Sequence, residues 1–266
     1  MPRLHRTRLL AAAFVLLAPF SMGAAAQEWA TSTDDSWCRD SRPRDRDRDR
    51  QCEIRITTLP ASGALAVDAG ANGGITVEGT DAGEVRIRAK VETRRGAQLE
   101  DVTIDLGAGH VETQGPERGD WSVSFRIEVP HGYDLDLVAR NGGLRVAGVD
   151  GQVRLETTNG GITLASMAGE VRGRTTNGGI SVALDGDTWH GDGLDVETSN
   201  GGVHLSVPAD YSAELVTGTV NGQLHLGFPV TVEGALRNEV RGTLGRGGPT
   251  VRAMTTNGGV KLTRAG

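Results

Sequence analysis

The sequence is poor in aromatic residues, lysine and cysteine. Among 266 residues, aromatics make up 4%, and there are 2 Lys against 26 Arg and only 2 Cys. Glycine occurs 39 times, roughly twice its usual share. Few aromatics with this much glycine exclude a helical bundle, and the lack of a Gly-X-Y period excludes collagen. Val, Ile and Leu are spread over the whole length, which indicates a folded core of small branched side chains.

Long apolar runs are absent after the first 26 residues. Three Arg precede the apolar run Leu9–Leu17, and Ala24 and Ala26 stand three and one positions before Gln27. This layout predicts a secretory signal peptide over residues 1–26. The run is too short to span ~30 Å of hydrocarbon, so we expect no membrane span. The sequence therefore predicts an exported protein, either periplasmic or at the cell surface or secreted from a bacterium.

Net positive charge is also lacking. The chain has 28 basic and 34 acidic residues, and its formal charge is −6 at pH 7. Removal of the predicted signal peptide takes away three Arg and no acid, which leaves a charge near −9. Because nucleic-acid affinity rests on basic contacts to phosphate, this balance argues against a nucleic-acid partner.

The two cysteines, Cys38 and Cys52, both follow the predicted signal peptide. An even pair in an exported chain predicts a disulfide, which closes a short loop and stabilises by ~3 kcal/mol in the loop-entropy estimate. An alternating Arg-Asp run, residues 44–50, lies between them and is typical of a solvated segment, although a small binding loop is the alternative. We divide the mature chain into an N-terminal polar segment, residues 27–58, and a body, residues 59–266.

The body is organised by a repeated Asn-Gly-Gly motif, with Asn-Gly-Gln as one variant. Successive copies are 69, 18, 18, 23, 21 and 36 residues apart, which indicates an 18-residue unit with occasional insertions. The asparagines are Asn72, Asn141, Asn159, Asn177, Asn200, Asn221 and Asn257.

Apolar residues recur three and five positions after each asparagine, and six positions before it. A polar residue stands between the first two apolar columns, and the members of this polar column are Thr76, Arg145, Thr163, Ser181, His204, His225 and Lys261. Apolar, polar, apolar is the period of a strand with one buried face. Each unit is therefore predicted to contain a strand, an Asn-Gly-Gly turn and a second strand.

Two architectures fit this unit. Asn-Gly is a strong hairpin signal and allows an antiparallel meander. Near-constant unit length and identical residues in column favour a parallel β-solenoid, where equal turns stack and asparagine side chains form a hydrogen-bonded ladder. We expect an all-β fold, a parallel β-solenoid of roughly ten short rungs with Asn-Gly-Gly turns. The stretch from Glu84 to Asp136 departs from the unit and predicts longer strands, with one helical turn near residues 97–101.

The order of several motifs resembles that of the bacterial putative-adhesin β-helix family, a domain of unknown function. These motifs are Trp37-Cys38, Cys52-Glu53, Asn72-Gly73-Gly74-Ile75, Trp121-Ser122-Val123, Val129-Pro130, the Thr-Asn-Gly-Gly repeats, residues 189–194, Val207-Pro208 and residues 244–248. The resemblance covers nearly all of the mature chain and implies a β-helix in a cell-envelope setting.

No catalytic motif is found in the sequence. A Gly-x-Ser-x-Gly nucleophile elbow and a His-Glu-x-x-His zinc motif are both absent, and no pattern indicates a cofactor. His204 and His225 occupy the same column in consecutive copies, so a shared metal is one interpretation and exposed strand histidines are the other. The insertion after Asp185 carries Asp187, Trp189, His190 and Asp192, which could form a carbohydrate subsite with Trp189 stacked on a sugar; a plain polar loop is the alternative.

These observations predict a non-enzymatic, exported envelope protein that binds or scaffolds an uncharacterised ligand. A long regular surface suits an extended partner such as a glycan or an envelope protein. A polysaccharide-acting enzyme that uses the loop from Asp185 to Asp195 is one alternative. A ligand-free structural or envelope-stress component is another.

Overall fold

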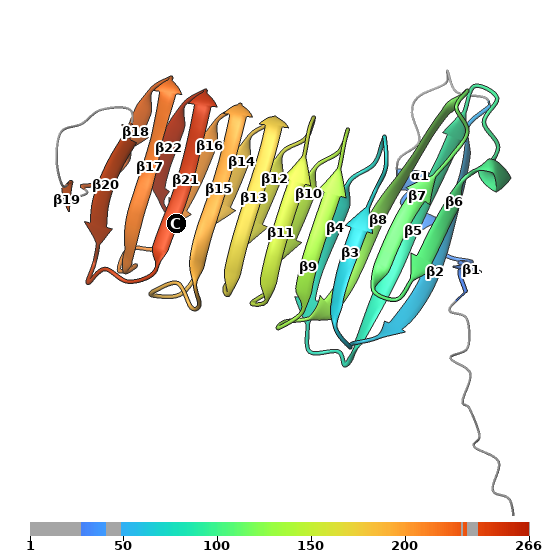
Figure 1. The fold of residues 1–266 in the computed structure, drawn as a ribbon, viewed down its shortest axis with the longest axis horizontal. Coiled ribbons are helices and arrows are strands. Elements are labelled where there is room, and N and C mark those ends of the chain that lie inside the picture. The colour runs from blue at the N-terminus through green and yellow to red at the C-terminus, as the bar shows by residue number, and fades with distance from the viewer. Residues whose placement is uncertain (1–27, 41–48, 230, 233–238, 266) are drawn as a thin grey trace, which may run out of the picture.

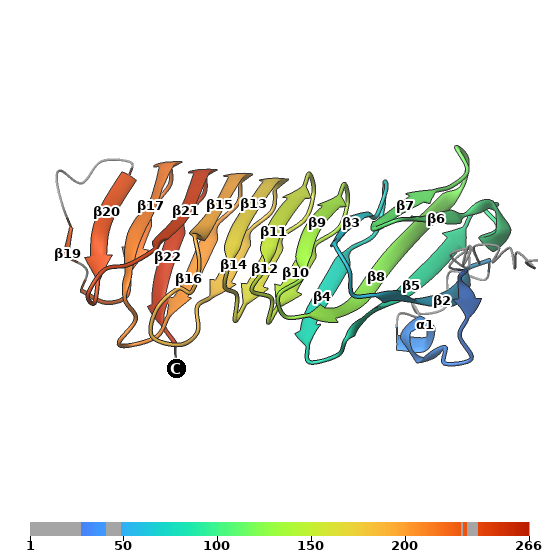
Figure 2. The same cartoon turned by 60° about the horizontal axis from the view of Figure 1, so that its bottom comes forward.

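The computed structural model describes residues 28–40, 49–229, 231–232 and 239–265. The predicted signal peptide and most of the alternating Arg-Asp run lie outside these residues. Two sheets of eleven strands each face one another and enclose the core between them (Figures 1 and 2). We call them sheet A and sheet B.

Sheet A contains, in spatial order, β1 (Ala30–Thr31), β2 (Gln51–Pro60), β5 (Glu84–Arg94), β8 (Asp120–Pro130), β4 (Ile75–Thr80), β10 (Leu144–Ala147), β12 (Ile162–Ala165), β14 (Ile180–Ala183), β16 (Val203–Val207), β22 (Val260–Arg264) and β18 (Leu224–Leu226). Sheet B contains β19 (Thr231–Val232), β20 (Glu239–Leu244), β17 (Ala213–Asn221), β21 (Thr250–Asn257), β15 (Gly193–Asn200), β13 (Glu170–Asn177), β11 (Gln152–Thr157), β9 (Asp134–Ala139), β3 (Ala64–Asp68), β7 (His110–Gln114) and β6 (Thr103–Gly107). The described residues include two short helices, α1 (Ser36–Asp40) and the 3₁₀ turn η1 (Leu99–Asp101).

The central part of each sheet is parallel, so the antiparallel meander is wrong. In sheet A all pairings from β8 to β18 are parallel, and in sheet B all those from β7 to β17. Seven rungs run along a strand of sheet B, through the segment that contains the asparagine, and back along a strand of sheet A; the rung of β7 and β8 has no asparagine. Eight strands of each sheet are mutually parallel, against the roughly ten rungs expected, because antiparallel strands occupy the remaining positions at the ends.

The stretch that departs from the repeat contains the long strands expected there. β5 and β8 are both 11 residues long and pair antiparallel in sheet A, while β6 and β7 form a hairpin at one end of sheet B. The expected helical turn is η1, which covers three residues. These elements enclose the N-terminal end of the stack (Figure 1).

The rungs do not follow chain order at either end of the stack. The last rung in the sequence, β21 with β22, lies between β15 with β16 and β17 with β18. In the same way, β3 with β4 lies between β7 with β8 and β9 with β10. The equivalence of the repeated units allows this, because each rung offers its neighbours the same backbone and the same apolar columns.

Asparagine side chains join the rungs through one continuous ladder. Each Nδ2 donates to the Oδ1 of the next asparagine at 2.8–3.2 Å, from the pair Asn141 and Asn72 to the pair Asn221 and Asn257. The spatial order is Asn72, Asn141, Asn159, Asn177, Asn200, Asn257 and Asn221. Such amide ladders stabilise stacked strands.

The first glycine of the motif is required because neighbouring backbones approach closely. A Cβ on Gly160 would overlap the carbonyl oxygen of Gly142, and the same holds at Gly142, Gly178, Gly201, Gly222 and Gly258 toward their own neighbours. The same carbonyls accept hydrogen bonds from threonine hydroxyls inside the stack at 2.7–2.9 Å. These donors are Thr157, Thr175, Thr198, Thr219 and Thr255. The second glycine is less constrained, since a Cβ on Gly161 would lie 3.0 Å from its nearest neighbour.

The N-terminal polar segment is attached to sheet A. Cys38 and Cys52 form the predicted disulfide, which connects α1 with β2. The Trp37 ring is covered by Arg126, whose Cζ lies 4.1 Å from the ring centroid, and by Lys90. Because β2 extends from Gln51 to Pro60 and pairs with β5, the boundary drawn between residues 58 and 59 falls inside a strand of the body.

Replacement of the first glycine should destabilise the stack far more than replacement of the second. We expect Gly160→Ala to lower the free energy of unfolding by about 3 kcal/mol, because a methyl group there overlaps backbone that cannot move without disturbing the ladder. Gly161→Ala, the matched control, should cost under about 1 kcal/mol. Urea unfolding followed by circular dichroism measures both. Equal losses in the two variants would contradict the close-approach explanation.

Loss of the disulfide should destabilise the protein by about 3 kcal/mol in the loop-entropy estimate. The double variant Cys38→Ser/Cys52→Ser removes it, and urea unfolding under oxidising conditions measures the effect. Addition of a reductant should lower the stability of the native sequence to that of the variant and leave the variant unchanged. If reductant leaves the free energy of unfolding of the native sequence unchanged, the disulfide contributes nothing to stability.

Candidate functional site

The insertion after Asp185, for which a carbohydrate subsite is one interpretation and a plain polar loop the other, does not offer an aromatic platform. The Trp189 side chain is only 2% exposed, and its indole Nε1 donates to the carbonyl oxygen of Gly169 at 3.0 Å. Trp189 therefore belongs to the core, and its ring is not available to stack on a sugar. Asp187, His190 and Asp192 are exposed.

The loop is held by two hydrogen bonds against the segment that precedes β17. The amide of Ser212 donates to the carbonyl oxygen of Asp187 at 2.7 Å, and the Thr188 hydroxyl donates to the carbonyl oxygen of Ser212 at 2.9 Å. Next to this contact lies Tyr211, whose side chain is buried. Burial, followed by the charges of Asp185 and Asp187, raises the pKa of Tyr211 to about 12. The loop thus packs as part of the stack.

His204 and His225 are not on neighbouring strands, contrary to the expectation. Lys261 of β22 lies between them, with His204 on one side and His225 on the other. The two histidines are therefore two strand spacings, about 10 Å, apart along the row. The His204 Nε2 is hydrogen-bonded to the Thr263 hydroxyl at 2.9 Å. Within the described part of the chain, no three His, Cys, Asp or Glu side chains form a group that could hold a metal ion.

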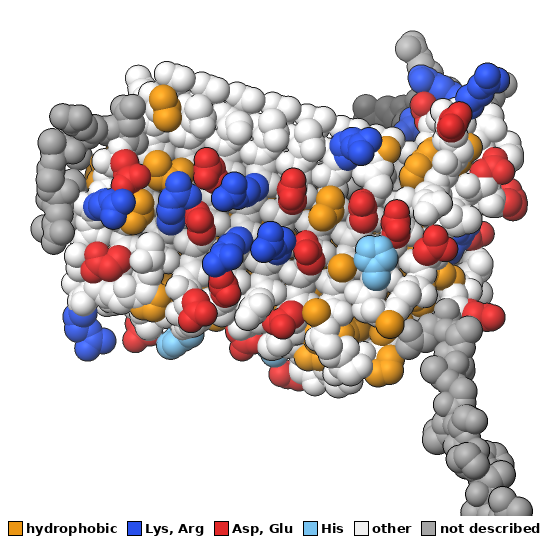
Figure 3. Space-filling view, in the orientation of Figure 1, with side chains coloured by type: hydrophobic (Ala, Val, Ile, Leu, Met, Phe, Trp, Pro, Cys, Tyr) orange, Lys and Arg blue, Asp and Glu red, His pale blue; other side chains and the backbone are white. Residues whose placement is uncertain are grey.

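The outer face of sheet B carries charges of both signs. Figure 3 shows acidic and basic side chains interleaved along the stack on this face. Arg252 of β21 lies 2.5 Å from Asp195 and 3.5 Å from Glu197, both on the neighbouring strand β15, and on β13 Arg172 pairs with Glu170 at 2.5 Å. Part of the charge on this face is therefore neutralised in ion pairs.

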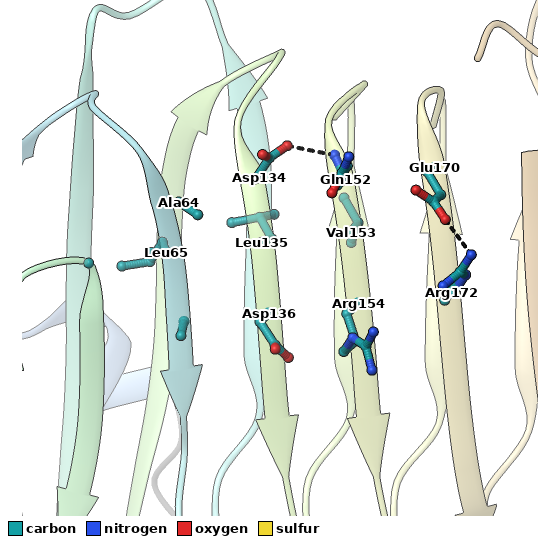
Figure 4. Close-up of a pocket in the computed structure, with 12 residues that line it drawn as sticks. Ala64, Leu65, Asp134, Leu135, Asp136, Gln152, Val153, Arg154, Glu170 and Arg172 are labelled. Atoms are coloured by element: carbon teal, nitrogen blue, oxygen red, sulfur yellow. Dashed lines mark hydrogen bonds and ion pairs between the residues drawn. The ribbon is translucent and has the colours of Figure 1, made fainter. Parts of the chain in front are cut away.

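A shallow hollow of about 330 Å³ lies on this face, where the small side chains of β3 meet the charged side chains of β9, β11 and β13 (Figure 4). Asp134 accepts a hydrogen bond from the backbone amide of Gln152 at 2.8 Å. Arg154 and Asp136 extend from neighbouring strands beside it. The polar side chains that line the hollow are exposed or half-buried, whereas Leu65, Leu135 and Val153 beneath them are buried, and nothing in this geometry indicates a catalytic constellation.

The outer face of sheet A differs in charge. The six strands from β10 to β18 contain no Asp or Glu. The outward column of these strands is, in spatial order, Arg145, Thr163, Ser181, His204, Lys261 and His225. The repeat in the sequence indicates this column, but Lys261 comes last in chain order, which does not reveal the inserted rung.

The fold and its two outer faces define a class, that of solenoid-like all-β proteins built from parallel rungs. A family model described as Toastrack DUF4097 matches residues 47–263. The chain belongs to this family, which confirms its resemblance to the putative-adhesin β-helix proteins of unknown function. The comparison with curated proteins gives no match.

Several solved structures are similar to this chain at low identity. A putative cell adhesion protein from Clostridium sporogenes is 12% identical, with a TM-score of 0.47, and the alignment covers 81% of this chain and 100% of that one. A putative adhesin from Bacteroides fragilis is 10% identical, with a TM-score of 0.31 and coverage of 80% and 97%. A putative lipid binding protein from Parabacteroides distasonis is 8% identical, with a TM-score of 0.30 and coverage of 80% and 97%.

No helix among the described residues has the length and apolar character needed to cross a bilayer. The disulfide is typical of proteins that reside outside the cytoplasm, where oxidising conditions preserve it. The disulfide agrees with an extracytoplasmic protein.

Ionisation of Tyr211 should weaken the fold at alkaline pH. Its pKa is raised from 10.0 to about 12 in the folded protein. Stability from the neutral phenol is therefore fully present below pH 10 and is lost as the pH rises toward 12, because the unfolded chain ionises first. We expect Tyr211→Phe to lose less stability than the native sequence between these pH values, measured by urea unfolding at several pH values. The same loss in both proteins would contradict the burial of a neutral phenol.

Proposed function

We propose that this chain is a non-enzymatic, exported cell-envelope protein whose outer sheet faces bind or scaffold an extended partner. The observation that supports this most is the in-register stacking of the rungs. Side chains of one column recur at each strand spacing of ~4.8 Å, and the asparagine ladder joins seven rungs. A surface with this regular period matches a partner that itself repeats, such as a linear glycan, or a strand of an envelope protein.

The envelope setting rests on two features. The predicted signal peptide implies export, and the disulfide implies an oxidising compartment such as the periplasm or the cell exterior. No membrane span and no cofactor form part of this proposal.

The enzyme alternative places chemistry in the loop from Asp185 to Asp195. The Trp189 ring is buried, so this loop has no aromatic side chain on which a sugar could stack. Asp187, His190 and Asp192 are exposed and are the polar side chains left to act on a substrate. A glycosidase needs a pair of carboxylates placed on opposite sides of a bound sugar, with one pKa raised so that it acts as an acid. We favour binding over catalysis because the Trp189 ring lies in the core and cannot hold a sugar against Asp187 and Asp192.

An array of envelope glycans and envelope proteins tests the proposal on the purified mature protein. We expect saturable binding to at least one extended component and no binding by the same protein after thermal unfolding, since the face exists only when the rungs are stacked. Absence of binding to every component of the array would instead support a ligand-free structural or envelope-stress component. Turnover of a glycan that disappears in Asp192→Ala would establish the enzyme alternative.

A further inference from the structure

Acidic side chains are absent from the strands of one face, in a protein whose net charge is −6. The six strands of sheet A from β10 to β18 carry Arg145, His204, His225, Lys261 and Arg264, and none of them contains an acid. The strands of sheet B that belong to the same rungs carry four arginines (Arg154, Arg172, Arg174 and Arg252) and seven acids. The acids are Asp134, Asp136, Glu156, Glu170, Asp195, Glu197 and Glu214. The two faces of one stack therefore differ in charge even though their rungs are equivalent.

Arg145 and Lys261 lie in one straight row on sheet A together with His204 and His225, whereas Arg264 lies outside this row and donates hydrogen bonds to the carbonyl oxygens of Pro208 and Ala209. The strand register places Arg145 beside Thr163, Thr163 beside Ser181, and Ser181 beside His204, followed by Lys261 and His225. The row crosses five strand spacings and is about 24 Å long. The two cationic ends are separated by hydroxyl side chains, so the row can accept one extended ligand that has both acidic and hydroxyl groups.

A concavity of about 720 Å³ follows the C-terminal part of this row. Its lining includes Ser181, His204, His225 and Lys261, and the exposed backbone of the second glycines Gly179, Gly202 and Gly259. Because these glycines have no side chain, a ligand can approach the backbone closely. The concavity therefore combines hydroxyl, imidazole, ammonium and peptide groups, which are the partners that sugar hydroxyls and carboxylates use.

We propose that this row on sheet A binds a linear acidic polysaccharide, with its carboxylates directed to Lys261 and Arg145 and its hydroxyls to the Thr and Ser side chains between them. The inference rests on the proposed binding function and names its face and its ligand class. Three observations support a glycan of moderate charge: the row has no acid, it repeats at the strand spacing, and it is rich in hydroxyl groups. A densely charged polyanion fits less well, because the protein as a whole is negative.

Binding of a fluorescently labelled oligomannuronate, measured by fluorescence anisotropy, tests the inference. A mannose oligosaccharide of the same length and linkage is the matched neutral ligand and should bind weakly. Lys261→Gln should weaken oligomannuronate binding about tenfold, as expected for loss of a charge-assisted hydrogen bond. Arg154→Gln is the matched control variant, because it removes one positive charge from the exposed face of sheet B. It should leave the affinity unchanged, whereas Ser181→Tyr should block the concavity.

Added salt should weaken the interaction, since the charges are exposed to solvent. Thermal unfolding of each variant checks that the fold is intact, which we expect because all three replaced side chains are exposed. Equal loss in Lys261→Gln and Arg154→Gln would overturn the assignment to sheet A.

The outcomes separate this inference from the proposed function. Binding to the neutral oligosaccharide alone, or to an envelope protein alone, would overturn the acidic-glycan inference and leave the proposed function standing. Comparable binding to a single-stranded oligonucleotide, or to vesicles of phosphatidylglycerol, would also overturn it, because the row would then attract any anion. Absence of binding to every component would count against both.

Discussion

The structure depends on the close approach of one rung's backbone to the next at the first glycine of each repeat. A Cβ on Gly160 would overlap the carbonyl of Gly142, so the rungs can stack in register only if this position has no side chain. Register then brings the asparagine amides within hydrogen-bond distance and aligns the buried threonines with the glycine carbonyls. The apolar columns of both sheets meet as a consequence, and a thin core of Val, Ile and Leu has little space for aromatic side chains.

The same register gives the outer faces their properties. Outward-facing residues at equivalent positions of the repeats lie in one straight row across the strands. A residue type that the repeats share therefore recurs along the row, and a substitution in one repeat changes the row at that strand. On sheet B, charges of opposite sign stand next to each other and form pairs such as Arg252 with Asp195. On sheet A the absence of acids leaves the positive groups without such partners across the strands from β10 to β18. A repeated unit therefore produces two chemically distinct surfaces.

Much of the fold could be predicted because its determinants are local. The alternation around each asparagine predicted the strands, the repeat length favoured the parallel solenoid, and the cysteine pair predicted the disulfide. Trp189 was misjudged, since its neighbours in the sequence are polar and nothing local shows that its ring enters the core. The order of the rungs was also hidden, although one signal exists. Gln223 replaces the second glycine, which fits β18 because it is the last strand of sheet A.

The sequence by itself determined the rung, its turn, its buried columns and the residues that face outward, because these follow from spacing within 18 residues. Only the tertiary structure decided which rungs are neighbours. Equivalent rungs can pair in more than one order. In the order observed, β17 is the last parallel strand of sheet B, and β20 pairs antiparallel with its free edge. That choice inserts β22 between β16 and β18, and so it places Lys261 between His204 and His225.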